Sequence, residues 1–166
     1  MPPFLLDANF FITAHRTSYP LDVFPSFWEK VKQLAETKQV ASIDKVRMEI
    51  YDNEDALKNW CVDNLPDDFF QDSSPALLLE YPQVVNWAYT KLDNPYSQAA
   101  LDIFMDADEA DAFLVAFAKK HTLAVVTNEV SAPDSKRNVK LPDACQAFDV
   151  RSISPVQLFR ELGVTI

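Results

Sequence analysis

The chain has 166 residues, of which 48% are hydrophobic, and its 25 Asp and Glu outnumber its 15 Lys and Arg, for a net charge of −10. This length suits one domain with its own core, and the negative balance disfavours non-specific binding of nucleic acid by the bulk surface. The single glycine, Gly163, excludes a Walker loop and a Rossmann fingerprint, because both need several glycines where the backbone approaches phosphate. Two histidines, His15 and His121, are too few for a three-histidine zinc site.

Three features favour a cytoplasmic protein. No run of about eighteen apolar residues is present, which argues against a membrane span. The first residues, MPPFLLDANF, lack the basic, apolar and small-residue pattern of a signal peptide. Cys61 and Cys145 have no metal-site spacing, so we expect two reduced thiols in the core.

The first part of the chain alternates strands and helices. Residues 4–6 are apolar and predict a buried strand that ends before Asp7, and a short helix is expected from about Asn9 to a point before Pro20. Residues 24–39 have apolar positions three and four apart, which predicts an amphipathic helix. A second buried strand is expected at residues 40–43, followed by a helix with Asp44 as its N-cap.

The middle of the chain, residues 52–105, has a different composition, with short acidic and aromatic segments. Ser74-Pro75 and Asn94-Pro95 each pair a capping residue with proline, which predicts helix starts. We therefore expect a helical insertion or lid within a single domain that spans residues 1–166.

The alternating pattern returns after residue 105. A helix capped by Asp108 leads into a strand at residues 123–127, and Pro142 marks the start of another helix. A short strand at 150–153 and a last helix from Ser154-Pro155 to Leu162, capped by Gly163, complete the chain. This order predicts an α/β fold, with three α/β/α layers and a parallel sheet of four or five strands.

Four acidic residues are placed where the strands and their following helices meet. Asp7 and Glu129 follow predicted strands, Glu49 lies on the helix after the second strand, and Asp111 begins an apolar helix. Ligands of open α/β sheets gather at the carboxyl ends of the strands, so we expect the four acids to converge. Ionised carboxylates close together repel one another unless a cation joins them, and oxygen ligands suit Mg²⁺ or Mn²⁺. The chemistry that follows is metal-dependent hydrolysis of a phosphodiester, with no histidine or covalent nucleophile required.

At these residues the sequence resembles the PIN-domain family. The matching segments are "LLDANFFI", "KVRMEI" and "ADAFLVAFAKKHTLAVVTNE", within residues 4–51 and 107–162. The resemblance implies a PIN-like α/β/α fold and a Mg²⁺- or Mn²⁺-dependent endoribonuclease, commonly the VapC-like toxin of a type II toxin–antitoxin pair. It implies Asp7, Glu49, Asp111 and Glu129 as catalytic and metal-binding acids, with Asn9 and Thr127 as supporting polar groups. The fourth acid is Glu where the family usually has Asp, and the 52–105 segment is longer than in the small toxins.

Further residues have two readings each. Asp108 could reach the metal or cap a helix, and Asp143 could face the site or act as a first-turn acid of its helix. Lys136, Arg137 and Lys140 lie in the loop after Glu129 and are the local candidates for contacting RNA phosphates, the alternative being a solvated loop.

Three other functions compete with the nuclease. A non-catalytic PIN-like module would bind RNA or a protein and keep the acids for structure. A phosphatase of the haloacid type needs a second Asp two residues after the first, where this chain has Asn9. An antitoxin or scaffold would use its acidity to mimic nucleic acid, whereas a toxin would have a small antitoxin protein as partner. The sequence leaves a homodimer open.

Overall fold

A five-stranded sheet forms the centre of the molecule, with all four strand pairs parallel and the order β3-β2-β1-β4-β5. The computed structural model describes residues 1–166. The strands are β1 (Phe4–Leu6), β2 (Val40–Ile43), β3 (Phe70–Gln71), β4 (Ala124–Val126) and β5 (Ser152–Ile153). The predicted α/β fold with a parallel sheet is therefore confirmed.

The central strand β1 pairs with β2 on one side and with β4 on the other. Phe4 is in register with Val40 of β2, and Leu5 is in register with Val125 of β4. All residues of β1 and β2 are buried, as expected for a parallel sheet that is covered on both faces. The carboxyl ends of β1, β2 and β4 consequently meet at one edge of the sheet.

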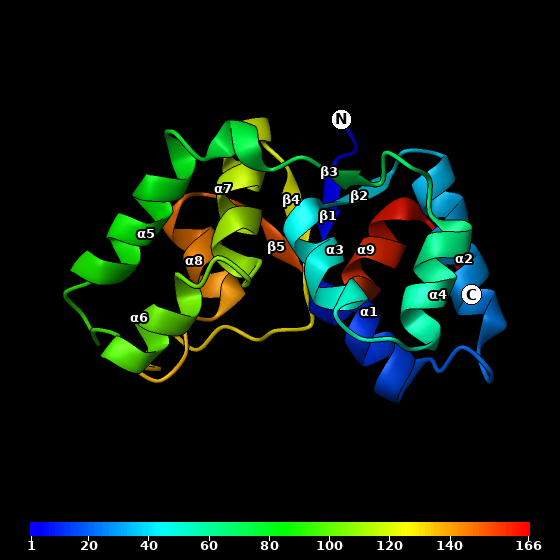
Figure 1. Cartoon of the computed structure of the whole chain (residues 1–166), viewed down its shortest axis with the longest axis horizontal. Coiled ribbons are helices and arrows are strands. Elements are labelled where there is room, and N and C mark those ends of the chain that lie inside the picture. Colours follow the sequence, from blue (N-terminus) through cyan, green and yellow to red (C-terminus); the bar gives the residue numbers. More distant parts are fainter.

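Two layers of helices cover the sheet (Figure 1). One layer contains α1 (Ala8–Thr13), α2 (Pro25–Glu36), α3 (Asp44–Tyr51), α4 (Ala56–Asn64) and α9 (Pro155–Leu162). The other contains α5 (Glu80–Thr90), α6 (Gln98–Phe104), α7 (Asp111–His121) and α8 (Leu141–Ala147). A π-helical turn at Ala14–Ser18 extends α1, and a 3₁₀ turn at Ser74–Ala76 precedes α5.

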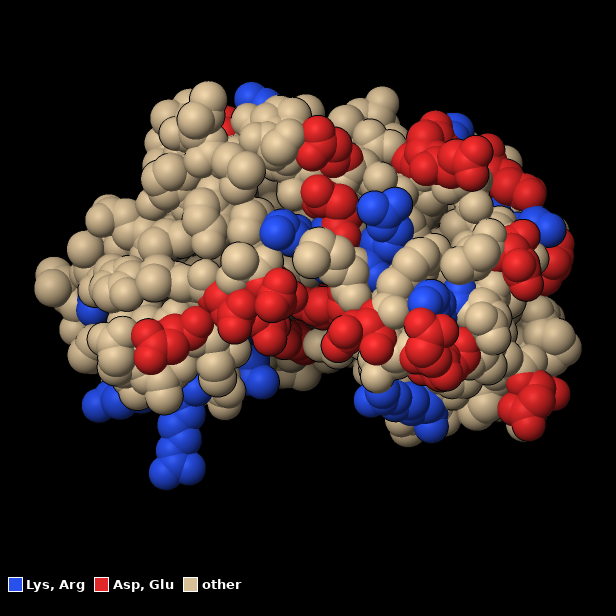
Figure 2. Space-filling model, viewed as in Figure 1, with Lys and Arg blue, Asp and Glu red and all other residues tan.

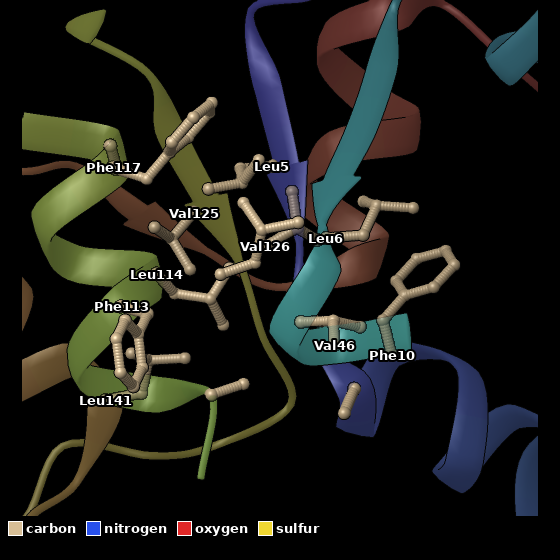
Figure 3. Close-up of a cluster of buried hydrophobic side chains, with 14 of the residues drawn as sticks. Leu5, Leu6, Phe10, Val46, Phe113, Leu114, Phe117, Val125, Val126 and Leu141 are labelled. Atoms are coloured by element: carbon tan, nitrogen blue, oxygen red, sulfur yellow. The ribbon is translucent and has the colours of Figure 1, made fainter. Parts of the chain in front are cut away.

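The core lies on both faces of the sheet. Figure 3 shows Leu114 and Leu141 of the α7–α8 layer on one side of the strands and Val46 of α3 on the other. Leu5 and Leu6 are successive residues of β1, so their side chains point to opposite faces, and both are fully buried. The hydrophobic run before Asp7 therefore fixes β1 between the two layers.

Two predicted helix starts and one predicted N-cap are wrong. Asp108 lies in a turn, where its N–H donates to Asp106 Oδ1 at 2.9 Å, and α7 begins only at Asp111. Asn94-Pro95 begins no helix, because Asn94 has a left-handed φ of 49°, and α6 instead takes Ser97 as its N-cap. Asp44 is the first residue of α3 rather than its N-cap.

The 52–105 segment is not helical throughout, because it adds β3 to the edge of the sheet beside β2. Its helix α5 packs on α7, with the rings of Tyr81 and Phe113 stacked at 4.5 Å. The segment thus builds part of both the sheet and one helical layer.

Two further sequence expectations concern the thiols and the membrane. Cys61 and Cys145 are both free and buried, as predicted. No helix combines the length and the apolar character that crossing a bilayer requires.

Candidate active site at the carboxyl edge of the sheet

Asp7 follows β1 directly and is the N-cap of α1. Its Oδ1 accepts a hydrogen bond from the Phe10 N–H at 2.7 Å, and its Oδ2 accepts one from Thr127 Oγ1 at 2.6 Å. The side chain is buried, and burial raises the pKa of Asp7 from 3.8 to about 7 although both hydrogen bonds oppose the shift. A carboxyl group that titrates near neutral pH therefore sits at the end of the central strand.

Glu49 reaches from α3 across the edge of the sheet to the start of α7. Its Oε1 accepts a hydrogen bond from the Ala110 N–H at 2.8 Å, and Ala110 is the N-cap residue of α7. Burial, followed by repulsion from Glu109, raises the pKa of Glu49 from 4.5 to about 7. Glu49 therefore contacts the backbone at the start of α7, where the sequence predicts Asp108 as the cap.

Glu129 similarly accepts a hydrogen bond from the backbone at the start of α8. Its N–H donates to Thr127 Oγ1 at 3.0 Å, and its Oε2 accepts from the N–H of Leu141, the first residue of α8, at 2.6 Å. Lys140, the N-cap residue of α8, offers no side-chain cap. Thr127 thus links the two acids that follow β1 and β4.

Asp111 differs from the other three acids, because no protein group donates a hydrogen bond to its carboxylate. It is the first residue of α7 and is half-buried. Burial raises the pKa of Asp111 well above its usual value, and repulsion by the carboxylates around it adds to the effect. Those neighbouring carboxylates are Glu129, Asp7, Glu49 and Glu109.

The four predicted acids are therefore brought together at one edge of the sheet, although they come from four separate segments. Asp7, Glu49 and Glu129 each accept a backbone N–H at the start of a helix, α1, α7 and α8 respectively. The positive ends of these helix dipoles offset part of the negative charge. Asp111 lies among the other acids with its oxygens uncommitted.

Two pockets open beside these acids and share the side chain of Glu109. The first, of about 190 Å³, is lined by Asp111 and Glu129 together with Arg137 and Lys140. The second, of about 490 Å³, is lined by Glu49, Arg16 and Asp108 among others. Together these two pockets, which share Glu109, form an acidic cleft, and Arg137 and Lys140 line its first pocket while Arg16 lines its second. Figure 2 shows acidic side chains gathered across the middle of this face, with basic side chains below them on both sides.

The donor set fits a hard divalent ion in its chemistry, since it consists of carboxylate oxygens with no thiolate or imidazole. No three Asp, Glu, His or Cys side chains lie close enough together to ligate one ion directly. Mg²⁺ commonly binds through one or two carboxylates and keeps several waters, so this spacing still accommodates it. Both oxygens of Asp111, Oε2 of Glu49 and Oε1 of Glu129 accept no hydrogen bond from the protein and are free to ligate.

The other predicted residues have mixed positions. The side chain of Asn9 is exposed, and only its carbonyl oxygen contacts the site region, where it accepts from Asn128 Nδ2 at 3.3 Å. Lys136 does not line the cleft, and its carbonyl oxygen accepts from the Ser97 N–H at 2.8 Å. Asp143 accepts hydrogen bonds from Ser131 Oγ and from the Ala132 N–H, and so holds the loop before α8.

The structure places two residues in the cleft that sequence reasoning missed, Glu109 and Arg16. Glu109 belongs to the run DADEAD, which signals a local concentration of charge, but the turn that aims Glu109 into both pockets is not visible in the sequence. Arg16 lies on the π-helical turn, and a π turn has no recognisable pattern in a single sequence.

Comparisons with known proteins identify the family of this chain but assign no activity to it. No curated protein and no solved structure matches the chain. The model of one family, described as a domain of unknown function (DUF4411), matches residues 4–166. Because the match covers nearly the whole chain, this protein belongs to the DUF4411 family.

Proposed function

We propose that this protein is a PIN-like, Mg²⁺- or Mn²⁺-dependent endoribonuclease. The observation that supports it most is Asp111, a carboxylate without a hydrogen-bond donor that lies among Glu129, Asp7 and Glu49. Such a concentration of carboxylates is unfavourable without a cation, and a bound divalent cation would convert this repulsion into attraction. The resemblance to the PIN family rests on the same four acids.

In this proposal Asp111 ligates the ion together with at most one of Asp7, Glu49 and Glu129, and the remaining acids hold it through water. When bound, the ion would lower the pKa of a water molecule and stabilise charge on a phosphoryl oxygen. Thr127 keeps Asp7 in place through the hydrogen bond from its Oγ1. The N–H groups of Ala110 and Leu141 likewise orient Glu49 and Glu129.

Arg137 and Lys140 line the same pocket as Asp111 and Glu129, and so are in position to bind the phosphates that flank the cut. Arg16 beside Glu49 could bind a phosphate at the other end of the cleft. Local cations of this kind allow an RNA strand to approach a chain whose net charge is −10.

The test is cleavage of a mixed RNA pool in Mn²⁺ by the wild type, by Asp111→Asn and by a matched control, Asp63→Asn. Asp63 is an exposed residue of α4 outside both pockets, so its variant makes the same chemical change elsewhere. We expect cleavage by the wild type and by Asp63→Asn, with a loss of at least about 100-fold in Asp111→Asn. Titration calorimetry should show Mn²⁺ binding lost in step with cleavage, while circular dichroism shows an unchanged fold.

A second candidate function is a non-catalytic module that binds RNA or protein. It is favoured by the three acids that accept backbone N–H groups at helix starts, because capping alone would give them a structural role. RNA binding without cleavage, together with the absence of Mn²⁺ binding, would favour this module over the enzyme.

The role as a toxin is part of the proposal and rests on the family resemblance. Its partner would be a small antitoxin protein. Expression of the wild type should then arrest bacterial growth, whereas expression of Asp111→Asn should not.

A further inference from the structure

An aromatic pocket lies next to the acidic cleft and plays no part in the mechanism above. It has a volume of about 170 Å³ and lies between the α1–α2 region and the start of α9. Its apolar walls include Phe10, Tyr19, Phe27 and Phe159, and its rim includes Ser154 and Asn128. Tyr19 and Phe27 stack on each other at 4.3 Å, and Phe159 meets Phe27 edge-on at 6.0 Å.

None of the residues that line this pocket is charged, although 24% of the chain is charged. The volume is also below the range of about 300–1,000 Å³ that is typical of sites for drug-sized ligands. Aromatic walls with hydroxyl and amide groups at the rim suit a small, neutral, planar ring. The rim residues Ser154 and Asn128 are exposed, so the mouth of the pocket is open to solvent.

Two chain segments form a partition between this pocket and the acidic cleft. In the segment that follows β4, Asn128 lines the aromatic pocket and the next residue, Glu129, lines the acidic one. In the π-helical turn, Ala14 and Ser18 line the aromatic pocket while Arg16 lines the cleft beside Glu49. Within each segment, residues one or two positions apart in the sequence therefore line the two sites.

We propose that the aromatic pocket binds one unstacked base of the RNA whose backbone crosses the acidic cleft. The inference rests on the proposed function for the identity of the nucleic acid. A base turned out of a single strand is neutral and planar, and it gains stacking contacts with aromatic side chains whatever its sequence. The phosphate of the same nucleotide would then lie close to the partition, within reach of Arg16.

Two variants test the pocket without disturbing the core. Val156 lines the pocket and is 51% exposed, so Val156→Trp should fill the pocket from its mouth. Val62 of α4 has a similar exposure of 57% and lines neither site, so Val62→Trp is the matched control. Circular dichroism and thermal melting should show both variants folded as the wild type.

The readout is binding of an eight-nucleotide RNA with Ca²⁺ in place of Mn²⁺, with the RNA checked on a gel for integrity. Each position of the RNA is replaced in turn by an abasic nucleotide. We expect one abasic position to weaken binding to the wild type by about 5- to 150-fold, the range expected for one stacked base. Val156→Trp should bind the intact RNA more weakly by a similar factor and be indifferent to that position, whereas Val62→Trp should match the wild type.

A cross-linking experiment locates the bound base independently of the variants. RNA that carries 5-iodouridine at the sensitive position should cross-link on irradiation to the peptide that contains Tyr19. The pocket proposal is overturned if no abasic position matters, if Val156→Trp binds as the wild type does, or if RNA does not bind at all. If Val156→Trp binds RNA as tightly as the wild type does, an apolar side chain of a protein partner becomes the better candidate for the occupant of the pocket.

The outcomes for the pocket and for the nuclease can be separated. RNA that binds with one sensitive position but is not cleaved in Mn²⁺ would support the pocket and refute the nuclease. Cleavage with no sensitive position would refute the pocket alone.

Discussion

Replacing Asp7 with Asn tests whether the negative charge of the buried Asp7 carboxylate destabilises the folded protein. Asn is as good an N-cap as Asp, so its side-chain oxygen can still accept from the Phe10 N–H. The Thr127 hydroxyl can rotate to pair with the amide, because a hydroxyl both donates and accepts. The substitution therefore removes the charge of Asp7 while it keeps the local hydrogen bonds.

The magnitude follows from the pKa of Asp7, which burial raises from 3.8 to about 7. Between these two pH values the folded protein keeps a proton that the unfolded chain has lost, so a rise in pH favours unfolding. Stability should fall as the pH rises from about 4 to about 7 and level off above. A shift of about three units corresponds to about 4 kcal/mol at 1.36 kcal/mol per unit, which is an upper bound for one buried group. Asp7→Asn should therefore be more stable than the wild type by up to about 4 kcal/mol at pH 8, with no difference near pH 4.

Urea unfolding at pH 4, 6 and 8 without divalent ions measures this difference. The gap between variant and wild type should widen with pH, while some slope remains in the variant because the pKa values of Glu49 and Asp111 are also raised. A variant equal to or less stable than the wild type at pH 8 would refute the reasoning, since it would mean that Asp7 stabilises the fold as a carboxylate. A gap that is constant with pH would refute the titration as its cause.

The remaining predictions concern the metal, the loop, the core and the last helix. Mn²⁺ at about 100 times its dissociation constant should stabilise the wild type by about 2.7 kcal/mol at pH 8, and an equal effect on Asp111→Asn would contradict direct ligation by Asp111. Asp143→Ala leaves Ser131 Oγ and the Ala132 N–H without an acceptor and should lower the free energy of unfolding in urea by about 1–3 kcal/mol. No change would mean that these two hydrogen bonds do not stabilise the loop. Leu114→Ala, at a fully buried position, should cost about 2–5 kcal/mol, and a cost below about 1 would mean that the core collapses around the change. Gly163→Ala should lower stability by only about 1 kcal/mol in thermal melting, because φ is 65° but nothing lies within 4 Å of the added methyl group.

Local sequence patterns determined the elements that are built from buried apolar residues. The predicted strands Phe4–Leu6 and Val40–Ile43 have the observed boundaries, because a short buried run bounded by helix starts is typical of a strand that is covered on both faces. The last helix was equally clear, since Ser154 caps its start and Gly163 adopts the left-handed conformation that ends it. The order of these elements was enough to predict a parallel sheet, and with it the edge at which the acids meet.

Tertiary structure decided how the acids are used. The sequence predicts Asp108 as the cap of α7, but the carboxylate that contacts the start of α7 is that of Glu49, 61 residues from Ala110, and Glu129 contacts the start of α8. No local pattern can reveal such a contact, because it depends on how α3 and α7 pack across the sheet. The same applies to Glu109, Arg16 and the 170 Å³ aromatic pocket, which form only where turns from separate segments meet. The sequence by itself determined that acids follow the strands, and long-range packing alone decided which carboxylate oxygens are bound by backbone N–H groups and which are left free.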